Sequence, residues 1–196
     1  NKASSVRQVC SNLGLAVALL VQVDRNGPEA TQAGGWPAPM GITLVADRLS
    51  AIMLVVAAIM LLAVLVYAIG QPGAERHHVS FQSVYLVLAA GVSASFLTGD
   101  LFSLFVAFEM MLMASYVLLT HQGRESQVRS GMTYVVINLF ASTLFLFGVA
   151  IVYSATGTVN MALLAERIPE LPAATQVGIG LWFLIVFGTK AAIFPL

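Results

Sequence analysis

Two charged side chains lie inside long apolar stretches of this sequence, and their types suggest proton chemistry. Glu109 is the only charged residue in the run of nineteen residues from Leu101 to Leu119. Lys190 lies in the final, mostly apolar segment, residues 173–196. A charge at the centre of a spanning helix costs on the order of 2.5–3.5 kcal/mol by insertion scales, so such a residue usually faces a partner or a water path. We therefore interpret Glu109 as a functional residue.

A carboxylate and an amine that meet in a low-dielectric environment form a proton switch. Each charge supports the other, and removing either one leaves the remaining charge desolvated. The two groups then titrate as a coupled pair whose states differ by one transferable proton. Our hypothesis is that Glu109 modulates the proton affinity of Lys190. The alternatives are a structural ion pair or a permanently protonated acid for Glu109, and a lysine that snorkels at a helix end for Lys190.

The composition is that of an integral membrane protein. Of the 196 residues, 59% are hydrophobic and only 9% are charged, whereas soluble domains have about 25% charged residues. Nine basic and nine acidic side chains cancel, so nothing indicates nucleic-acid binding. The single cysteine, Cys10, excludes an internal disulfide and leaves no metal-binding spacing. Because the chain begins at Asn1 and stops inside an apolar run, we expect it to be part of a longer protein.

The apolar periodicity predicts an all-α, polytopic membrane fold in a single transmembrane domain. A run of about 20 apolar residues is long enough to cross the bilayer. Gly188 and Thr189 before the lysine and Pro195 after it should loosen the last helix, so we expect that helix to be discontinuous. Interrupted helices are tolerated at membrane depth where they line a cavity. About six spans are predicted, at residues 5–23, 47–70, 81–98, 101–119, 131–153 and 174–196.

The segments between the spans carry polar residues with mainly structural interpretations. Asp47 and Asp100 each precede an apolar run and are predicted to cap the helix that follows. The alternatives are a functional role for Asp47 and an ion-entry role for Asp100. The Gly- and Pro-rich segment Asp24–Pro39 is predicted to be a non-helical connection. Residues Val159–Arg167 are predicted to form a short amphipathic helix at the membrane interface. Three polar residues inside the fifth span either hydrate a channel or bond helix to helix, and the second is commoner: Asn138, Ser142 and Thr143.

The basic residues predict which side of the membrane each loop faces. If successive spans cross the membrane in opposite directions, five basic residues lie on one side of it and three on the other. The positive-inside rule predicts that the side with five is cytoplasmic. The five are Lys2, Arg7, Arg76, Arg124 and Arg129.

Several short stretches resemble the D subunit of Mrp-type multisubunit cation/proton antiporters. They cover nearly the whole chain from Gly34 onward: Gly34-Gly35-Trp36-Pro37-Ala38-Pro39, Ala46-Asp47-Arg48-Leu49-Ser50, Gly99-Asp100-Leu101-Phe102, Phe108-Glu109, Ser115-Tyr116, Gly188-Thr189-Lys190-Ala191-Ala192 and Phe194-Pro195-Leu196. Ser103 stands where the pattern has asparagine. These subunits belong with the proton-pumping membrane subunits of respiratory complex I and membrane-bound hydrogenases. The resemblance implies an antiporter-like inverted-repeat fold.

The resemblance also implies a function for the two charges. In that superfamily a glutamate on the fifth helix pairs with a lysine on the broken seventh helix, and Glu109 and Lys190 match the two motifs. The implied protein exchanges Na⁺ or another monovalent cation for H⁺, in the cell (inner) membrane, together with other membrane subunits of a hetero-oligomeric complex. The resemblance implies no cofactor and no metal site. The alternatives are a proton-pumping subunit of a complex I-like oxidoreductase or hydrogenase, and a membrane scaffold that transports nothing.

Overall fold

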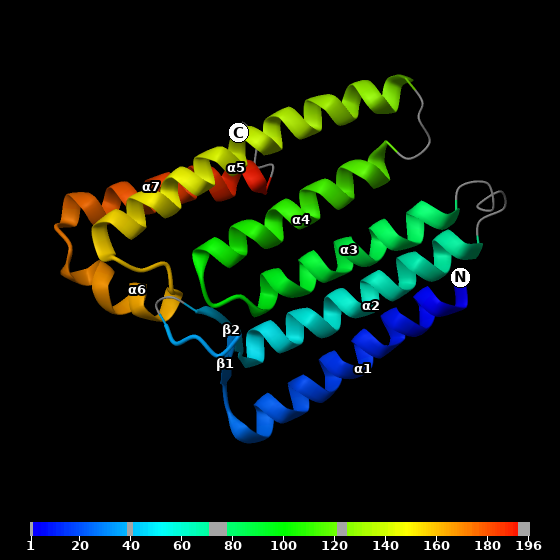
Figure 1. Cartoon of the computed structure of the whole chain (residues 1–196), viewed down its shortest axis with the longest axis horizontal. Helices are drawn as coiled ribbons and strands as arrows, with labels where there is room; N and C mark the ends of the chain where they lie inside the picture. The colour runs from blue at the N-terminus through cyan, green and yellow to red at the C-terminus, as the bar shows by residue number, and fades with distance from the viewer. Residues whose placement is uncertain (1, 39–40, 71–77, 121–124, 192–196) are drawn as a thin grey trace.

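The computed structural model describes residues 2–38, 41–70, 78–120 and 125–191 (Figure 1). Seven α-helices, one 3₁₀ turn and two strands make up these residues. The long helices are α1 (Lys2–Asn26), α2 (Arg48–Gly70), α3 (His78–Leu97), α4 (Leu101–Leu119), α5 (Glu125–Thr156) and α7 (Ala173–Lys190). The short elements are α6 (Met161–Arg167), the 3₁₀ turn Ile168–Glu170, β1 (Glu29–Ala33) and β2 (Ile42–Ala46).

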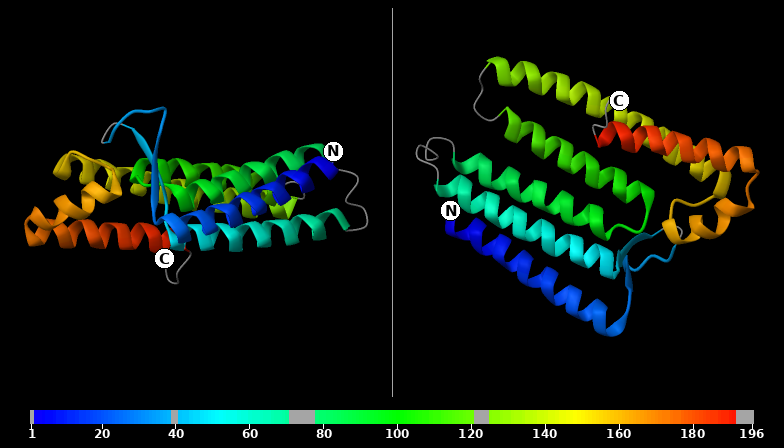
Figure 2. Two further views of the ribbon diagram at one scale, coloured as in Figure 1. Left: turned by 90° about the horizontal axis from the view of Figure 1, so that it is seen from below. Right: turned by 180° about the vertical axis from the view of Figure 1, so that it is seen from behind.

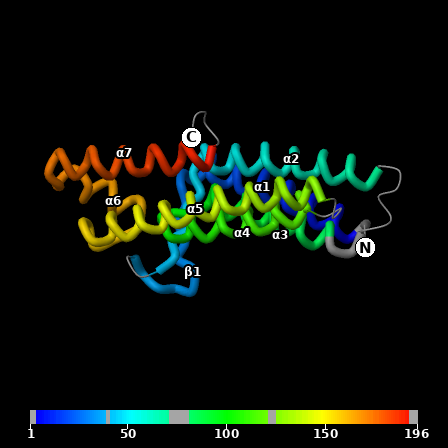
Figure 3. The backbone as a smooth tube through the Cα atoms, turned by 90° about the horizontal axis from the view of Figure 1, so that it is seen from above, coloured from blue at the N-terminus to red at the C-terminus, as the bar shows by residue number. Residues whose placement is uncertain are grey.

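The long helices lie roughly parallel to one another, and successive ones run in opposite directions. Helices α1 to α5 follow one another across the view of Figure 1, and α7 lies beside α5. Seen from above, α2 and α7 lie along one side of the molecule and α3, α4 and α5 along the other (Figure 3). The two strands and α6 lie near the ends of α1 to α4 that are away from the N-terminus, where the strands project out of the layer of helices (Figure 2). We call this the hairpin end.

The all-α polytopic membrane fold predicted from the sequence is confirmed, apart from the two strands. Within the described residues, five helices are long and apolar enough to cross a membrane: α1, α2, α4, α5 and α7. Helix α3, at the predicted span 81–98, has a shorter apolar part, Phe81–Leu97. Large apolar side chains such as Leu15, Tyr67 and Leu184 are exposed on the helices, as lipid-facing residues are. Helix α5 begins at Glu125 and ends at Thr156, which is longer than the predicted span at 131–153.

The connection at Asp24–Pro39 was predicted to be non-helical; of its described residues only 24–26 are helical, and Glu29–Ala33 form a strand that was not predicted. Helix α1 continues to Asn26, and β1 then pairs antiparallel with β2, with Glu29 opposite Ala46 and Ala33 opposite Ile42. Gly34 and Gly35 follow β1 with φ of 73° and 74°, a backbone conformation that glycine adopts without steric cost. The sequence of β1, Glu-Ala-Thr-Gln-Ala, has no alternation of large apolar residues, so its pattern did not reveal a strand.

Strand β2 ties the turn between α3 and α4 to the connection between α5 and α6. The amide of Gly99 donates to the carbonyl of Thr43 at 2.8 Å, and the amide of Met161 donates to the carbonyl of Gly99 at 2.9 Å. The Asn160 side-chain amide donates to Thr43 Oγ1 at 3.0 Å, and both residues are buried. A Cβ on Gly99 would lie 2.8 Å from Val45 Cγ2, so only glycine fits there. We call Thr43, Gly99 and Asn160 the hairpin-end junction.

Both predicted aspartate caps are present. Asp47 Oδ1 accepts a hydrogen bond from the amide of Ser50 at 2.7 Å at the start of α2. Asp100 Oδ1 accepts one from the amide of Ser103 at 2.6 Å at the start of α4, and Asp100 Oδ2 accepts one from Ser103 Oγ at 2.8 Å. The burial of Asp100, only 5% exposed, agrees with a structural role, because both carboxylate oxygens have a donor.

The short helix predicted at Val159–Arg167 is α6, which begins two residues later. Asn160 Oδ1 caps it by accepting from the amides of Ala162 and Leu163 at 3.1 and 3.2 Å. Leu164 is buried and packs with Val152 and Ile179 of the neighbouring helices. Helix α6 therefore adds to the core at the hairpin end. Its position at a membrane interface stays a prediction.

Candidate functional site

Glu109 and Lys190 both lie near the middle of the molecule. Glu109 is close to the centre of α4. Lys190 is the last residue of α7, and α7 ends part of the way along α5, not at its far end (Figure 1). The helix stays regular through Gly188 and Thr189 and ends at the lysine itself. Pro195, which was predicted to help interrupt this helix, lies outside the described residues.

Ser142 of α5 lies between the two charges and bonds to both. Lys190 Nζ donates to Ser142 Oγ at 2.7 Å, and Ser142 Oγ donates to Glu109 Oε1. The direct distance from Lys190 Nζ to Glu109 Oε1 is 3.9 Å. Ser142 is only 2% exposed, and the side chains of Lys190 and Glu109 are 13% and 28% exposed. The three side chains form one hydrogen-bonded chain that joins α7, α5 and α4.

An aromatic ring covers one side of the ammonium group. Lys190 Nζ lies 5.6 Å from the centre of the Phe108 ring, a distance at which the ring face attracts a cation. Phe108 precedes Glu109 on α4, so the same turn of helix supplies both the ring and the carboxylate.

A polar cavity adjoins Lys190 on the side away from the hairpin end. Its volume is about 260 Å³, and helices α3, α4, α5 and α7 line it. Its polar lining comes from Lys190, Ser115, Tyr134 and Asn138, and Ser115 Oγ lies 2.8 Å from Tyr134 Oη. A cavity of this size with several polar partners has room for water molecules. The cavity therefore offers hydrogen-bond partners for water beside the lysine.

The opposite side of the charge pair is closed by phenylalanine rings. Phe145, one turn beyond Ser142 on α5, is 0% exposed. Its ring centre lies 5.6 to 6.1 Å from those of four other rings, which we call with it the phenylalanine cluster: Phe105, Phe108, Phe183 and Phe187. The inner face of α5 thus changes from polar before Ser142 to apolar after it.

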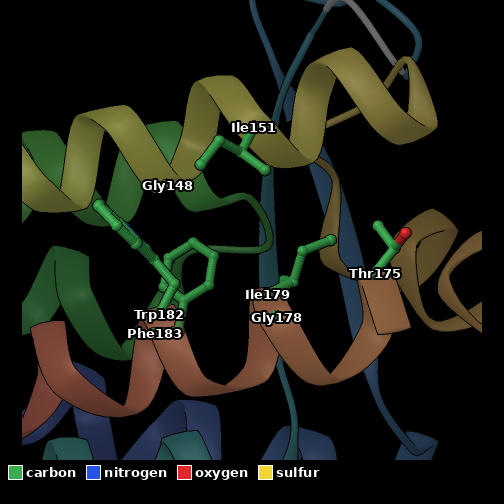
Figure 4. Close-up of a pocket in the computed structure, with 7 residues that line it drawn as sticks. All are labelled: Gly148, Ile151, Thr175, Gly178, Ile179, Trp182 and Phe183. Carbon is green, nitrogen blue, oxygen red and sulfur yellow. The ribbon is translucent and has the colours of Figure 1, made fainter. Parts of the chain in front are cut away.

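A second cavity lies between α5 and α7, nearer the hairpin end (Figure 4). Gly148 and Ile151 line it from α5, and Thr175, Gly178, Ile179, Trp182 and Phe183 line it from α7. The rings of Trp182 and Phe183 point from α7 into the space between the two helices. The Trp182 indole N–H donates to the carbonyl of Leu144 at 2.9 Å. The apolar lining makes this cavity unsuited to an ion.

The structure brings together the two residues selected from the sequence, while their role in proton transfer stays a prediction. Sequence reasoning did not place Ser142 in the site. The signal that could have found it is the spacing of Tyr134, Asn138 and Ser142, which recur every four residues and so share one helix face. Within the described residues, no group of three or more histidine, cysteine, aspartate or glutamate side chains could hold a metal ion. His77, in the polar stretch between the predicted spans 47–70 and 81–98, lies outside those residues.

Comparisons with known proteins find both sequence and structural relatives. The family model described as NADH:quinone oxidoreductase/Mrp antiporter, TM, matches residues 98–196. The D subunit of the Na(+)/H(+) antiporter of Alkalihalophilus pseudofirmus is 45% identical over 189 residues, which are 96% of this chain and 38% of that protein. The D subunit of a probable K(+)/H(+) antiporter of Rhizobium meliloti is 46% identical over 173 residues, which are 87% of this chain and 32% of that protein.

Two solved structures share the fold. A chain of the Mrp complex from Dietzia sp. DQ12-45-1b superposes with a TM-score of 0.88 at 32% identity, over 98% of this chain and 36% of that one. A chain of the membrane-bound sulfane sulfur reductase, an archaeal respiratory membrane complex, superposes with a TM-score of 0.87 at 30% identity, over 100% of this chain and 40% of that one. The chain thus spans well under half the length of each of these four proteins.

Proposed function

The chain belongs to the family of transmembrane subunits that NADH:quinone oxidoreductases and Mrp antiporters share, and from this premise we propose that it translocates protons in a monovalent cation/proton antiporter. The observation that carries the proposal is the contact of Glu109 and Lys190 through Ser142, which joins three of the long helices. Relatives named as antiporter D subunits support the antiporter class. Na⁺ is the cation we propose.

The distance between the two charges is short enough for one to control the other. At 3.9 Å between Nζ and Oε1 and an effective dielectric constant of about 20, their attraction is about 4 kcal/mol. Thermal energy at 25 °C is about 0.6 kcal/mol, so neutralising the carboxylate changes the free energy of the ammonium by several times this amount. Glu109 is therefore the control group, and Lys190 is the group that passes its proton on.

The surroundings of the pair support access from one side at a time. The polar cavity at Ser115, Tyr134 and Asn138 provides polar groups beside Lys190, while the phenylalanine cluster lies toward the hairpin end. Tyr134 lies about one turn from Arg129, on the side that the basic residues predict to be cytoplasmic. In this state of the protein Lys190 exchanges protons with the cytoplasm.

The full protein works as part of an assembly. The likeness to a chain of the Dietzia Mrp complex supports partnership with other membrane subunits, and the apolar helices support multi-pass insertion in a lipid bilayer, which we propose is the cell (inner) membrane. The remainder of the route for protons and for the cation then lies in sequence outside this chain and in those partners.

A second candidate function is a proton-pumping subunit of a redox complex. The superposition on the sulfane sulfur reductase complex favours it, because that respiratory complex has a chain of the same fold. The charge pair fits both functions. Inverted vesicles distinguish them: collapse of a respiration-generated pH gradient on addition of Na⁺ supports the antiporter, and pumping that depends on an electron acceptor supports the redox complex.

The role of the pair is tested with Glu109→Ala in the assembled complex. We expect Na⁺-dependent proton movement to be abolished while the complex assembles normally. Full activity of this variant would overturn the proposed role, and so would normal transport after Glu109 and Lys190 are neutralised together, which is the result expected of a scaffold. Thr143→Ala is a matched control, because Thr143 is exposed on α5 and donates to the carbonyl of Leu139 in its own helix.

A further inference from the structure

The geometry points to a third member of the proton-transfer site: we propose that the Ser142 hydroxyl relays the proton between Lys190 and Glu109. This inference rests on the proposed function of the pair. Its basis is the direction of two hydrogen bonds. Lys190 Nζ donates to Ser142 Oγ at 2.7 Å, and Ser142 Oγ in turn donates to Glu109 Oε1.

The direct path between the two charges is longer than a hydrogen bond. Lys190 Nζ and Glu109 Oε1 are 3.9 Å apart, whereas an N–H···O bond spans about 2.7–3.2 Å. A hydroxyl carries one donor and two acceptor sites, so Ser142 is able to receive a proton from the amine while it gives its own to the carboxylate. The serine thus supplies the hydroxyl that bridges the 3.9 Å between the two charged groups.

The transfer step conserves protons and electrons without a co-reactant. An N–H bond of the Lys190 ammonium breaks and an O–H bond forms at Ser142 Oγ. At the same time the original O–H bond of Ser142 breaks and an O–H bond forms at Glu109 Oε1. The ion pair becomes a neutral amine and a neutral carboxylic acid, and the serine ends as it began. Reversal of the step restores both charges.

The surroundings of Ser142 suit a fixed relay. Its side chain is buried, at 2% exposure, so bulk water does not compete for its two bonds. Glu109 is the only charged residue in the sequence of α4 and Lys190 the only one in that of α7. The charged residues of α5, Glu125 and Arg129, lie in its first turns, more than three turns before Ser142. Among the described residues of α4, α5 and α7, Glu109 and Lys190 are therefore the charged groups nearest to Ser142, which lies between them.

The hydroxyl at position 142 is tested by substitution in the full-length protein within its assembled complex. Ser142→Ala removes the relay, and Ser142→Thr keeps a hydroxyl at the same atom. Positioned proton transfer contributes about 10²–10⁴-fold to rate, so we expect Ser142→Ala to slow cation-driven proton movement at least tenfold with the apparent affinity for the cation unchanged. Ser142→Thr should retain at least a third of the wild-type rate. Thr143→Ala, which removes an exposed hydroxyl bonded to the carbonyl of Leu139, should have no effect.

The outcomes separate the relay from the function of the pair. The relay is overturned if Ser142→Ala transports within twofold of the wild type, or if Ser142→Thr is as slow as Ser142→Ala. In either case a strict requirement for Glu109, measured in the same vesicles with Glu109→Gln, leaves the proposed function intact. If Glu109→Gln transports normally, the proposed function fails, and the relay fails with it.

Discussion

The side-chain amide of Asn160 donates to Thr43 Oγ1 at 3.0 Å, although the two residues are 117 positions apart in the sequence. This bond links β2 to the connection that follows α5. The amides of Leu101 and Met161 add backbone bonds to Val159 and Gly99, at 3.0 and 2.9 Å. The start of α4 is thereby fixed to the end of α5, and these are the helices that carry Glu109 and Ser142.

The hairpin-end junction should be important for stability. Thr43→Val leaves the Asn160 amide without its partner in a buried site, and an unsatisfied buried donor costs about 1–3 kcal/mol. We expect a lower thermal unfolding temperature and partial loss of transport. Asn160→Asp, which keeps the acceptor that caps α6, should be less damaging than Asn160→Ala. Thr31→Val, at an exposed position of β1, is the control. An unfolding temperature of Thr43→Val equal to that of the control would show that the bond is not needed.

Lys190→Arg should abolish proton movement although it keeps the positive charge. A guanidinium group does not release its proton in proteins, so it can pair with Glu109 but cannot pass a proton on. The measurement is Na⁺-induced collapse of the pH gradient in vesicles, with assembly checked by purification of the complex. Transport by the arginine variant at the wild-type rate would mean that Lys190 serves only as a fixed charge.

Two glycines that line the same apolar cavity should respond in opposite ways to alanine. A Cβ on Gly148 would lie 2.8 Å from Trp182 Cδ1, and the indole is held by its bond to Leu144, so Gly148→Ala should destabilise the protein by about 1–3 kcal/mol. A Cβ on Gly178 would meet nothing within 4 Å. Gly178→Ala should therefore stabilise α7 by up to about 1 kcal/mol through helix propensity. Thermal unfolding of both variants tests the contrast, and equal shifts would contradict it.

The cap at Asp47 should make stability sensitive to acid. The backbone amide of Ser50, followed by its side chain, lowers the pKa of Asp47 below its usual value of 3.8. A lowered folded-state pKa means that the stabilisation is complete above the unfolded pKa and is lost as the pH falls through the folded value. We expect Asp47→Ala to cost about 1 kcal/mol near neutral pH, and this difference from the wild type to shrink below about pH 4. A difference that stays constant on acidification would contradict the assignment.

Features that depend on local sequence were predictable. The caps at Asp47 and Asp100 follow from one side chain and the apolar run after it, and the structure contains both. The resemblance to Mrp-type D subunits is confirmed by the relatives, since its motifs are short and contiguous. The extension of α5 to Glu125 was not predicted, because the first turns of this helix are polar. A polar stretch beside an apolar run is typical of a loop outside the membrane.

Features that depend on contacts between distant segments were not predictable. The hairpin exists because Thr43 and its neighbours meet Gly99 and Asn160, and no property of the Glu29–Ala33 sequence indicates this. In the sequence, Ser142 cannot be distinguished from a serine that only forms a hydrogen bond between two helices. Its position between Glu109 and Lys190 follows only from the way α4, α5 and α7 pack together.

The end of α7 at Lys190 has an electrostatic consequence. The peptide dipoles of a helix add to about half a negative charge at its carboxyl end, and here Lys190 is itself the last residue of the helix. Unlike a carboxylate, this partial charge binds no proton and so does not change with pH. It therefore favours a cation at this position whatever the protonation state of Glu109.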